Sequence, residues 1–318
     1  MNTLIDAPRR IARRLVSPLR PKSRAWLEAL PGFAVPADAI ETLHGPQALQ
    51  QALLAQIAQA TRRIVIVTLY LQDDDAGREV MEALHAAHAR RPALEIDVFV
   101  DWHRAQRGLI GKQKSPGNAA MYRDCAQRHG GGVRVWGVPV QNRELFGVLH
   151  LKGFVFDDTV LYSGASLNDV YLAKHGRYRL DRCQRIRDAA LADSMAAFAL
   201  RHFRDSEAVR RLDLPDPPPT RALLPAIRAF RQQLQQAGYL VPVTALPAGA
   251  VAVTPLKGFG RADNALNDAM LALLRGARRR IVLLTPYFNL PRPVRAAAGQ
   301  ALRRGCSVEI IVGDKTAN

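Results

Sequence analysis

A histidine and a lysine stand two residues apart in GVLHLKGFVFDD, the segment that spans residues 147 to 158. They are His150 and Lys152, and Asp157 completes the spacing H-x-K-x4-D. The surrounding apolar residues predict a strand over 148–157, and strand alternation places His150 and Lys152 on the same face of it. Charged side chains are rarely buried in a strand unless they are paired or functional. The spacing therefore indicates a reactive site.

The segment SGASLND adds Ser166 and Asn168 downstream, where we expect a helix to begin. A histidine imidazole can attack phosphorus, and a lysine ammonium offsets charge on phosphate oxygens. Serine, asparagine and the backbone N–H groups of a helix N-terminus supply further hydrogen-bond donors. The pattern predicts a phosphoryl site that needs no metal ion and no organic cofactor. The alternative is a structural histidine beside a lysine with a buried stem.

A second polar segment, DWHRAQRG, follows directly after the strand expected over 94–101. Loops at strand ends carry binding residues in many α/β proteins. We therefore predict a substrate-binding role for Asp101, His103, Arg104 and Arg107. The alternative is a polar loop that caps a helix.

Two other polar groups are interpreted as structural. Asp73, Asp74 and Asp75 stand between a strand and a helix, and helix N-termini favour acidic residues. His85 and His88 stand three residues apart on an expected helix, which is a weak metal signal without further ligands, so we expect them to be surface residues.

Alternating helical and strand patterns must position these residues. We expect helices over 48–63, 76–91, 118–132 and 221–237, and strands over 64–71, 94–101, 133–138, 148–157 and 160–164. This order predicts an α/β fold, with helices packed on a mixed sheet.

An internal repeat links the two ends of the chain. RRIVIVTLYLQ, residues 62–72, matches RRIVLLTPYFN, residues 279–289, and the strand at 96–100 matches the one at 308–312. Both copies share the order helix, Arg pair, buried strand, helix, strand, which favours duplication. At the same spacing, a second histidine motif would fall near position ~367. We therefore expect the second copy to be incomplete in this chain.

The repeat and a proline-rich segment, DLPDPPPT, predict four regions. A basic N-terminal segment covers 1–45, and the first half, with the histidine motif, covers 46–212. A proline-rich linker and helix cover 213–245. The start of the second half covers 246–318.

The net charge of +17 indicates a polyanionic partner, such as nucleic acid, a ribosome or an acidic phospholipid surface. The first thirty residues contain seven Lys or Arg against two acids. Within them, PRRIARRLVSPLR has the spacing of a short helix that lies on a membrane surface, although a solvated basic tail is the alternative.

Cysteine and hydropathy patterns exclude some classes of protein. Three scattered cysteines do not form a disulfide framework or a cysteine zinc site, and they fit a reducing compartment. We find no apolar run long enough to span a membrane and no signal-peptide pattern, so we expect a protein kept in the cytoplasm.

The H-x-K-x4-D motif, followed by Gly164 and Ser-x-Asn, resembles the signature of the phospholipase D superfamily. Five blocks narrow this resemblance to the Gram-negative-type phosphatidylserine synthases: DWHRAQRG, GVLHLKGFVFDDTVLYSGASLNDVYL, VTPLKGFG, TPYFNLP and VEIIVGDKTAN. Ser166 and Asn168 lie one residue further from Asp157 than in most of the superfamily, an offset that this enzyme type shares. The resemblance implies an α/β/α sandwich of two pseudo-symmetric halves, of which the second is incomplete here.

The resemblance also implies a two-step transfer from CDP-diacylglycerol to L-serine through a phosphatidyl-histidine intermediate. One motif histidine attacks phosphorus and expels CMP, and the other transfers protons. The sequence does not say which of the two histidines is the nucleophile. In many members of the superfamily it is the first, which is His150 here, and Lys152 and Asn168 are implied to hold phosphate oxygens. The resemblance further implies peripheral attachment to the cytoplasmic face of the inner membrane.

Two other readings remain open at this point. The first is another phospholipase D-superfamily enzyme, such as a phosphodiesterase or a cardiolipin synthase. The second is an inactive fragment that binds lipid or nucleic acid, because one motif does not complete a site with two histidines. The sequence does not determine the oligomeric state.

Overall fold

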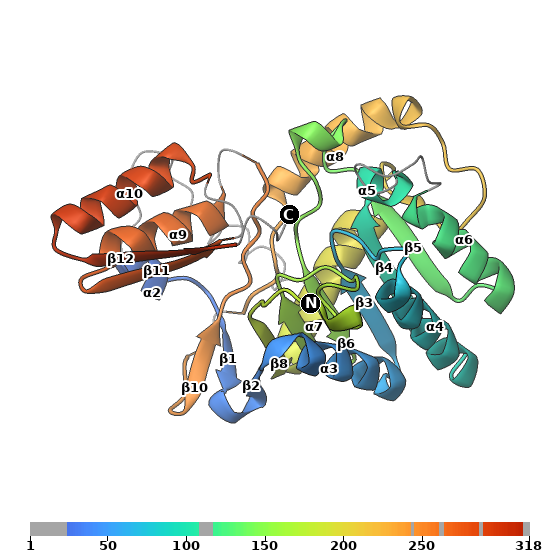
Figure 1. The fold of residues 1–318 in the computed structure, drawn as a ribbon, viewed down its shortest axis with the longest axis horizontal. Coiled ribbons are helices and arrows are strands. Elements are labelled where there is room, and N and C mark those ends of the chain that lie inside the picture. The colour runs from blue at the N-terminus through green and yellow to red at the C-terminus, as the bar shows by residue number, and fades with distance from the viewer. Residues whose placement is uncertain (1–23, 108–116, 243–244, 261–263, 286–288, 314–318) are drawn as a thin grey trace, which may run out of the picture. The chain divides into compact units, whose positions relative to one another are not determined.

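Continuous apolar runs form the centre of an eight-stranded sheet (Figure 1). The computed structural model describes residues 24–107, 117–242, 245–260, 264–285 and 289–313. The chain divides into two units. The larger unit contains residues 33–240 and 244–253, and the smaller unit contains residues 1–32, 241–243 and 254–318. The predicted membrane-surface helix near the N-terminus lies outside the described residues.

The large sheet combines three neighbouring parallel strands with antiparallel strands on both sides of them. Its strands are β2 (Ile40–Leu43), β3 (Arg63–Val67), β4 (Glu95–Asp101), β5 (Val133–Val138), β6 (Gly153–Phe156), β7 (Thr159–Ser163), β8 (Cys183–Arg187) and β9 (Arg210–Arg211). The spatial order is β2-β8-β7-β6-β3-β4-β5-β9, and β3, β4 and β5 run parallel. The other neighbouring pairs are antiparallel, so β6 pairs with β3 on the edge that β4 leaves open.

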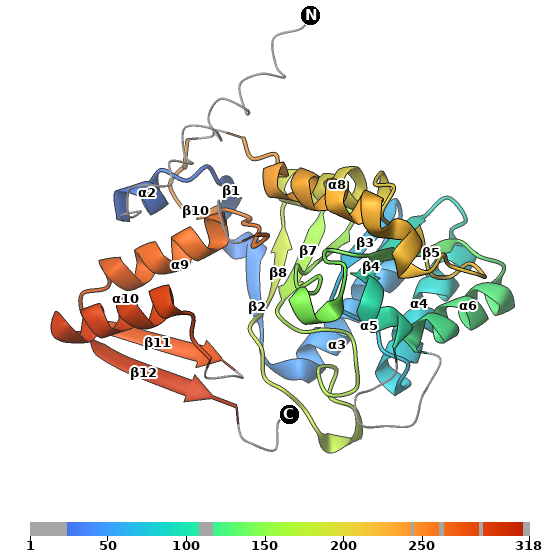
Figure 2. The same cartoon turned by 90° about the horizontal axis from the view of Figure 1, so that it is seen from above.

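Helices pack on the sheet, and their buried apolar side chains form the core together with those of the strands. They are α3 (Gly45–Gln59), α4 (Asp75–Arg90), α5 (Trp102–Gln106), α6 (Asn118–His129), α7 (Ala189–Ala199) and α8 (Leu224–Gln236). Helices α3 and α6 both pack against α4, which contacts β4 and β5 (Figure 2). Helix α7 packs on β3, β6 and β7. A two-stranded sheet of β1 (Phe33–Pro36) and β10 (Ala250–Val253) completes the larger unit.

The smaller unit repeats the start of the larger one. It contains α2 (Arg24–Glu28), α9 (Ala265–Gly276), β11 (Arg280–Thr285), α10 (Arg292–Arg303) and β12 (Ser307–Val312). Strands β11 and β12 are parallel, as β3 and β4 are. The order α9-β11-α10-β12 matches α3-β3-α4-β4, so the predicted α/β fold with an internal repeat is confirmed.

Three local predictions are wrong. His85, expected at the surface, is 3% exposed on α4. The strand expected over 148–157 is limited to β6, Gly153–Phe156, so His150 and Lys152 precede the strand. Gly147 and Gly153 have φ angles of 137° and 155°, which interrupt the extended ladder on both sides of the histidine. The helix expected at Ser166 is also absent, because Leu167 pairs with Leu71 in a parallel bridge.

None of the helices in the described residues combines the length and the apolar character needed to cross a bilayer.

Candidate active site

His150 and Lys152 meet although they lie outside a strand. Lys152 Nζ is 3.4 Å from His150 Nδ1 and 3.4 Å from the His150 carbonyl oxygen. The Lys152 residue is 6% exposed, whereas His150 is exposed to solvent. The pair therefore presents an accessible imidazole over a buried ammonium, as a site for a phosphate group would require.

Burial lowers the pKa of both residues, and the charge of Lys152 lowers the pKa of His150 further. Loss of water around Lys152 lowers its pKa to about 8, and the charge of Asp181 opposes this shift. Loss of water around the ring also lowers the pKa of His150, and the neighbouring Lys152 lowers it further. A lowered pKa keeps the imidazole neutral at physiological pH, which is the form that can act as a nucleophile.

Ser166 and Asn168 are buried and contact Tyr70, which is also buried. Asn168 Nδ2 lies 3.5 Å from the Tyr70 hydroxyl, and Ser166 also hydrogen-bonds to the Tyr70 side chain. Backbone bonds of 3.1 Å from Leu167 N to Tyr70 O and 2.9 Å from Gln72 N to Leu167 O hold the two segments together. This long-range pairing replaces the helix that the sequence predicted.

The loop after β4 contains the four residues predicted to bind substrate. Asp101 is fully buried, and its carboxylate accepts hydrogen bonds from the backbone amides of His103, Arg104 and Leu149 at 3.0, 2.9 and 2.8 Å. Burial raises the pKa of the Asp101 carboxyl above its usual range. The acceptors of Asp101 are thus used within the protein.

The two arginines of this loop share one carboxylate. Arg107 pairs with Glu144 through two nitrogens, one of them at 2.6 Å, and Arg104 Nη1 lies 3.7 Å from the same carboxylate. The Arg104 guanidinium also lies over the Tyr70 ring, 5.1 Å from its centroid. A ring nitrogen of His103 lies 2.9 Å from the carbonyl oxygen of Gln141. These contacts join the loop after β4 to the segment that leads to His150.

Asp157 lies beyond the far end of β6 from Lys152, in the turn to β7. Its carboxylate accepts backbone N–H bonds from Thr61, Arg62 and Arg63 at 2.8–3.0 Å. Burial acts to raise the pKa of Asp157, but these amides outweigh it and leave the pKa below its usual value. Asp157 adopts a φ of 50° in the turn. The geometry is that of a residue that fastens the β6–β7 hairpin to the start of β3.

Sequence reasoning missed two residues beside the motif. Tyr70 could have been found, because the repeat shares the pattern Thr-x-Tyr after its first strand. Asp181 had no sequence signal. Its charge acts on Lys152, and its carboxylate fills the space where a Cβ at Gly164 would lie 2.6 Å from Asp181 Oδ2. Gly164 is thus the residue that lets the loop with Asp181 approach.

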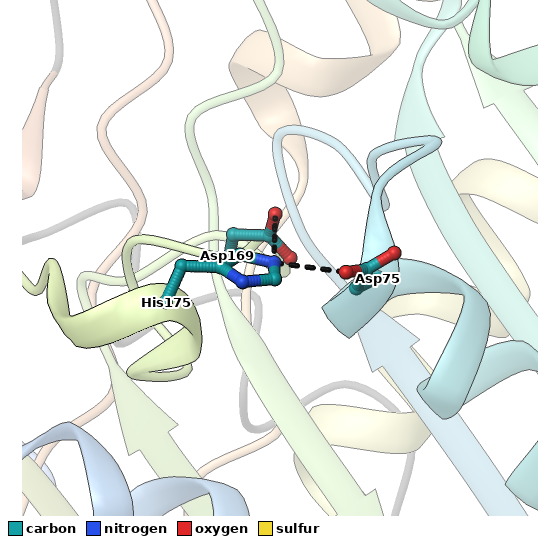
Figure 3. Close-up of side chains that lie close together, drawn as sticks. All are labelled: Asp75, Asp169 and His175. Atoms are coloured by element: carbon teal, nitrogen blue, oxygen red, sulfur yellow. Dashed lines mark ion pairs between the residues drawn. The ribbon is translucent and has the colours of Figure 1, made fainter.

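A cluster of Asp75, Asp169 and His175 connects the segment that follows Asn168 to the start of α4 (Figure 3). His175 Nε2 lies 2.8 Å from Asp75 Oδ2 and 3.6 Å from Asp169 Oδ2. Asp169 also accepts a 2.8 Å bond from the backbone amide of Ala76, at the start of α4. Although these groups could hold a cation, their mutual contacts favour a role in joining this segment to α4.

Comparisons with known proteins show which proteins the chain is similar to. No family model matches the chain. It is 44% identical over 300 residues to a CDP-diacylglycerol–serine O-phosphatidyltransferase of Escherichia coli K12, covering 94% of this chain and 66% of that protein. A Haemophilus influenzae protein of the same description is 42% identical over 298 residues, covering 92% of this chain and 65% of its own length. The resemblance to phosphatidylserine synthases is confirmed.

The solved structures agree with this result. The crystal structure of phosphatidylserine synthase from Haemophilus influenzae superimposes with a TM-score of 0.86 and 40% identity, over 92% of this chain and 65% of that one. The chain spans about two thirds of the length of these synthases. Its mixed α/β architecture is therefore that of a phosphatidylserine synthase over the part that the two proteins share.

Proposed function

We propose that the protein carrying this chain transfers a phosphatidyl group from CDP-diacylglycerol to L-serine, giving phosphatidylserine and CMP. The observation that carries the proposal is the 44% identity over 94% of the chain to a protein described by this activity. The contact between His150 and Lys152 supports it, because it combines a nucleophile with a cation for phosphate oxygens.

In the first step, His150 forms a bond to the phosphatidyl phosphorus, and the bond from that phosphorus to the CMP oxygen breaks. Nδ1 faces Lys152, so attack is assigned to Nε2. The ring proton is then on Nδ1, and Lys152 donates to the His150 carbonyl oxygen and not to the ring. In the second step, the serine hydroxyl oxygen attacks phosphorus and its proton is removed. The bond from phosphorus to His150 then breaks and frees the ring.

Other residues around His150 are assigned by their contacts. We propose that Lys152 and Asn168 bind non-bridging phosphate oxygens, with Ser166 and Tyr70 holding Asn168 in place. Arg104 and Arg107, with His103, are proposed to face the cytidine diphosphate end, since their two charges share one carboxylate, that of Glu144, and so retain a net positive charge.

A two-step transfer of this kind uses a second histidine for proton transfer. The sequence contains one H-x-K-x4-D motif. We propose that the partner histidine comes either from another segment of the complete protein or from a second copy of the chain. Measuring the mass of the active species decides between these sources.

We also propose peripheral attachment to the cytoplasmic face of the inner membrane. Leu145 and Phe146, 89% and 59% exposed, lie four to five residues before His150, and the loop before Asp181 exposes Leu180 at 76%. Exposed apolar side chains beside exposed basic ones, such as Arg143, suit an anionic lipid surface. Nucleic-acid or ribosome binding has the net charge alone in its favour, so we rank it second.

A serine-transfer assay tests the proposed function. Label from serine should enter lipid only when CDP-diacylglycerol is present, and CMP should appear in equal amount. Transfer to water or to glycerol phosphate in place of serine would instead indicate another enzyme of the phospholipase D superfamily. If the protein does not react with CDP-diacylglycerol at all, the result would favour a lipid-binding or nucleic-acid-binding protein over an enzyme.

A further inference from the structure

One buried carboxylate joins two segments on which the proposed transfer depends. Asp101 ends β4 and is 0% exposed. One oxygen, Oδ1, accepts the amides of His103 and Arg104 at the start of α5. The other oxygen, Oδ2, accepts the amide of Leu149 at 2.8 Å. The residue after Leu149 is His150, so Asp101 acts one peptide away from the proposed nucleophile.

The same residue also contacts the segment that carries Tyr70. The backbone amide of Asp101 donates to the carbonyl oxygen of Leu69 at 3.1 Å. Arg104, whose amide Asp101 accepts, lies over the Tyr70 ring. Three segments around the site therefore meet at Asp101, two of them through its carboxylate and the third through its backbone amide.

Helix capping alone does not explain a carboxylate at this position. A serine hydroxyl or an asparagine amide caps a helix about as well, whereas an ionised carboxylate is costly to bury. A carboxylate has a second acceptor oxygen, and at Asp101 that oxygen accepts the amide of Leu149. The requirement for two acceptors that point in different directions accounts for the buried aspartate.

Asp97 provides a comparison on the same strand. It is 1% exposed, and its carboxylate accepts from the Arg134 guanidinium at 2.7 Å and from Trp136 Nε1 at 2.7 Å. Its partners are these two side chains of β5 and Arg204, whose Nη1 lies 3.8 Å away, and they do not include the segment before His150. Asp97 is thus a buried carboxylate on β4 with a structural contact and no described contact to the site.

We propose that Asp101 is a positioning residue for the proposed phosphatidyl transfer: its carboxylate holds Leu149, and with it His150, in register with the arginine loop. This inference rests on the proposed function. It predicts that loss of the Leu149 contact lowers kcat more than it alters substrate binding, because a small displacement of a reacting group costs about 100-fold in rate.

The test compares Asp101→Asn with Asp97→Asn in the complete protein that carries this sequence. Asparagine can still cap α5 through its oxygen, but its NH2 group then faces the Leu149 amide, and two donors cannot bond. We expect kcat for serine-dependent CMP release to fall by about 100-fold in Asp101→Asn, with KM for CDP-diacylglycerol within about threefold. Hydrogen exchange in the peptide that contains Leu149 should accelerate in this variant and not in Asp97→Asn.

Asp101→Ser serves as the second variant, since a hydroxyl caps the helix but does not reach Leu149. A kcat within about twofold of the unaltered enzyme in Asp101→Asn, or an equal loss in Asp97→Asn, would overturn the inference. Failure of both Asp101 variants to fold where Asp97→Asn folds would also overturn it, since Asp101 would then serve stability. If the unaltered protein releases no CMP with serine, the proposed function itself fails.

Discussion

The pairs β3–β4 and β11–β12 share a sequence pattern and a parallel register, but only the first is enclosed. In β3, Ile64 and Ile66 are fully buried. In β11, Ile281 is 7% exposed, whereas Leu284 is 75% exposed. The repeat therefore determines the strand pair and does not by itself determine what covers it.

The two strand pairs differ at the edge of the first strand that faces away from its parallel partner. In the larger unit, β3 pairs with β6, and the histidine and lysine of the motif immediately precede β6. Asp157, at the other end of β6, fastens the hairpin to the start of β3. The strand added beside the repeated pair thus brings the reactive residues to the sheet, and α7 packs on both β3 and β6.

The largest effect should come from Lys152→Met, which removes the cation beside His150. We expect serine transfer to fall by about 10²–10³-fold, since one preorganised electrostatic contact contributes on that order. The ammonium lowers the pKa of His150, so its removal should raise that pKa and move the acidic limb of the kcat/KM profile to higher pH.

Lys174→Met is the control for this prediction. Lys174 pairs with Glu79 at 3.1 Å, on the segment that follows Asn168. It should leave the pH profile unchanged. An equal loss of transfer in both variants would mean that Lys152 acts only through the net charge of the protein and not through its contact with His150.

The two copies of the repeat should also differ in stability. Ile66→Ala opens a cavity in an enclosed strand and should lower the free energy of unfolding by about 2–5 kcal/mol. Leu284→Ala, in the exposed position of β11, should cost less than about 1 kcal/mol. Urea denaturation of the purified chain measures both, and a similar cost at the two positions would show that β11 is covered in solution.

Exposed apolar residues occur in both units, and membrane binding can separate their roles. If Leu145 and Phe146 enter lipid, the double change to aspartate should weaken binding to vesicles rich in anionic lipid by about tenfold or more. Leu284→Asp is the matched change in the smaller unit and should have no such effect. Cosedimentation with vesicles measures both, and the opposite ranking would assign the lipid surface to the smaller unit.

The smallest effect should come from Asp157→Asn, which weakens the fastening of β6 to β3. The pKa of Asp157 is lowered in the folded state, so its contribution to stability is present above the unfolded value of about 3.9 and is lost as pH falls through the folded value. Thermal unfolding between about pH 5 and 2 should thus show a weaker pH dependence in the variant. An unchanged dependence would remove Asp157 from this role.

The sequence predicted the parts of the fold that local pattern determines. Strand β5 spans Val133–Val138, as expected, and the element order of the repeat is confirmed. Prediction from the sequence failed where the contacts are long-range or where glycines interrupt the pairing of strands. The apolar run around His150 matches a strand, but Gly153 takes a φ of 155°, and its Cα side is filled by Met195 of α7, where an added Cβ would lie 2.4 Å from the sulfur-bound methyl.

The candidate site was predicted by residue type better than by geometry. The pairing of His150 with Lys152 holds although the strand that predicted it does not form. The position of Asp181 beside Gly164 and the two-way contact of Asp101 depend on loops that meet only in the folded chain. No local spacing encodes such contacts.

The most direct test of the account is to trap the intermediate. The complete protein is incubated with CDP-diacylglycerol in the absence of serine, digested, and analysed by mass spectrometry. The account predicts a phosphatidyl adduct on the peptide that contains His150, which disappears when serine is added and is absent from His150→Ala but present in the control His44→Ala. An adduct on another residue, or full turnover by His150→Ala, would contradict it.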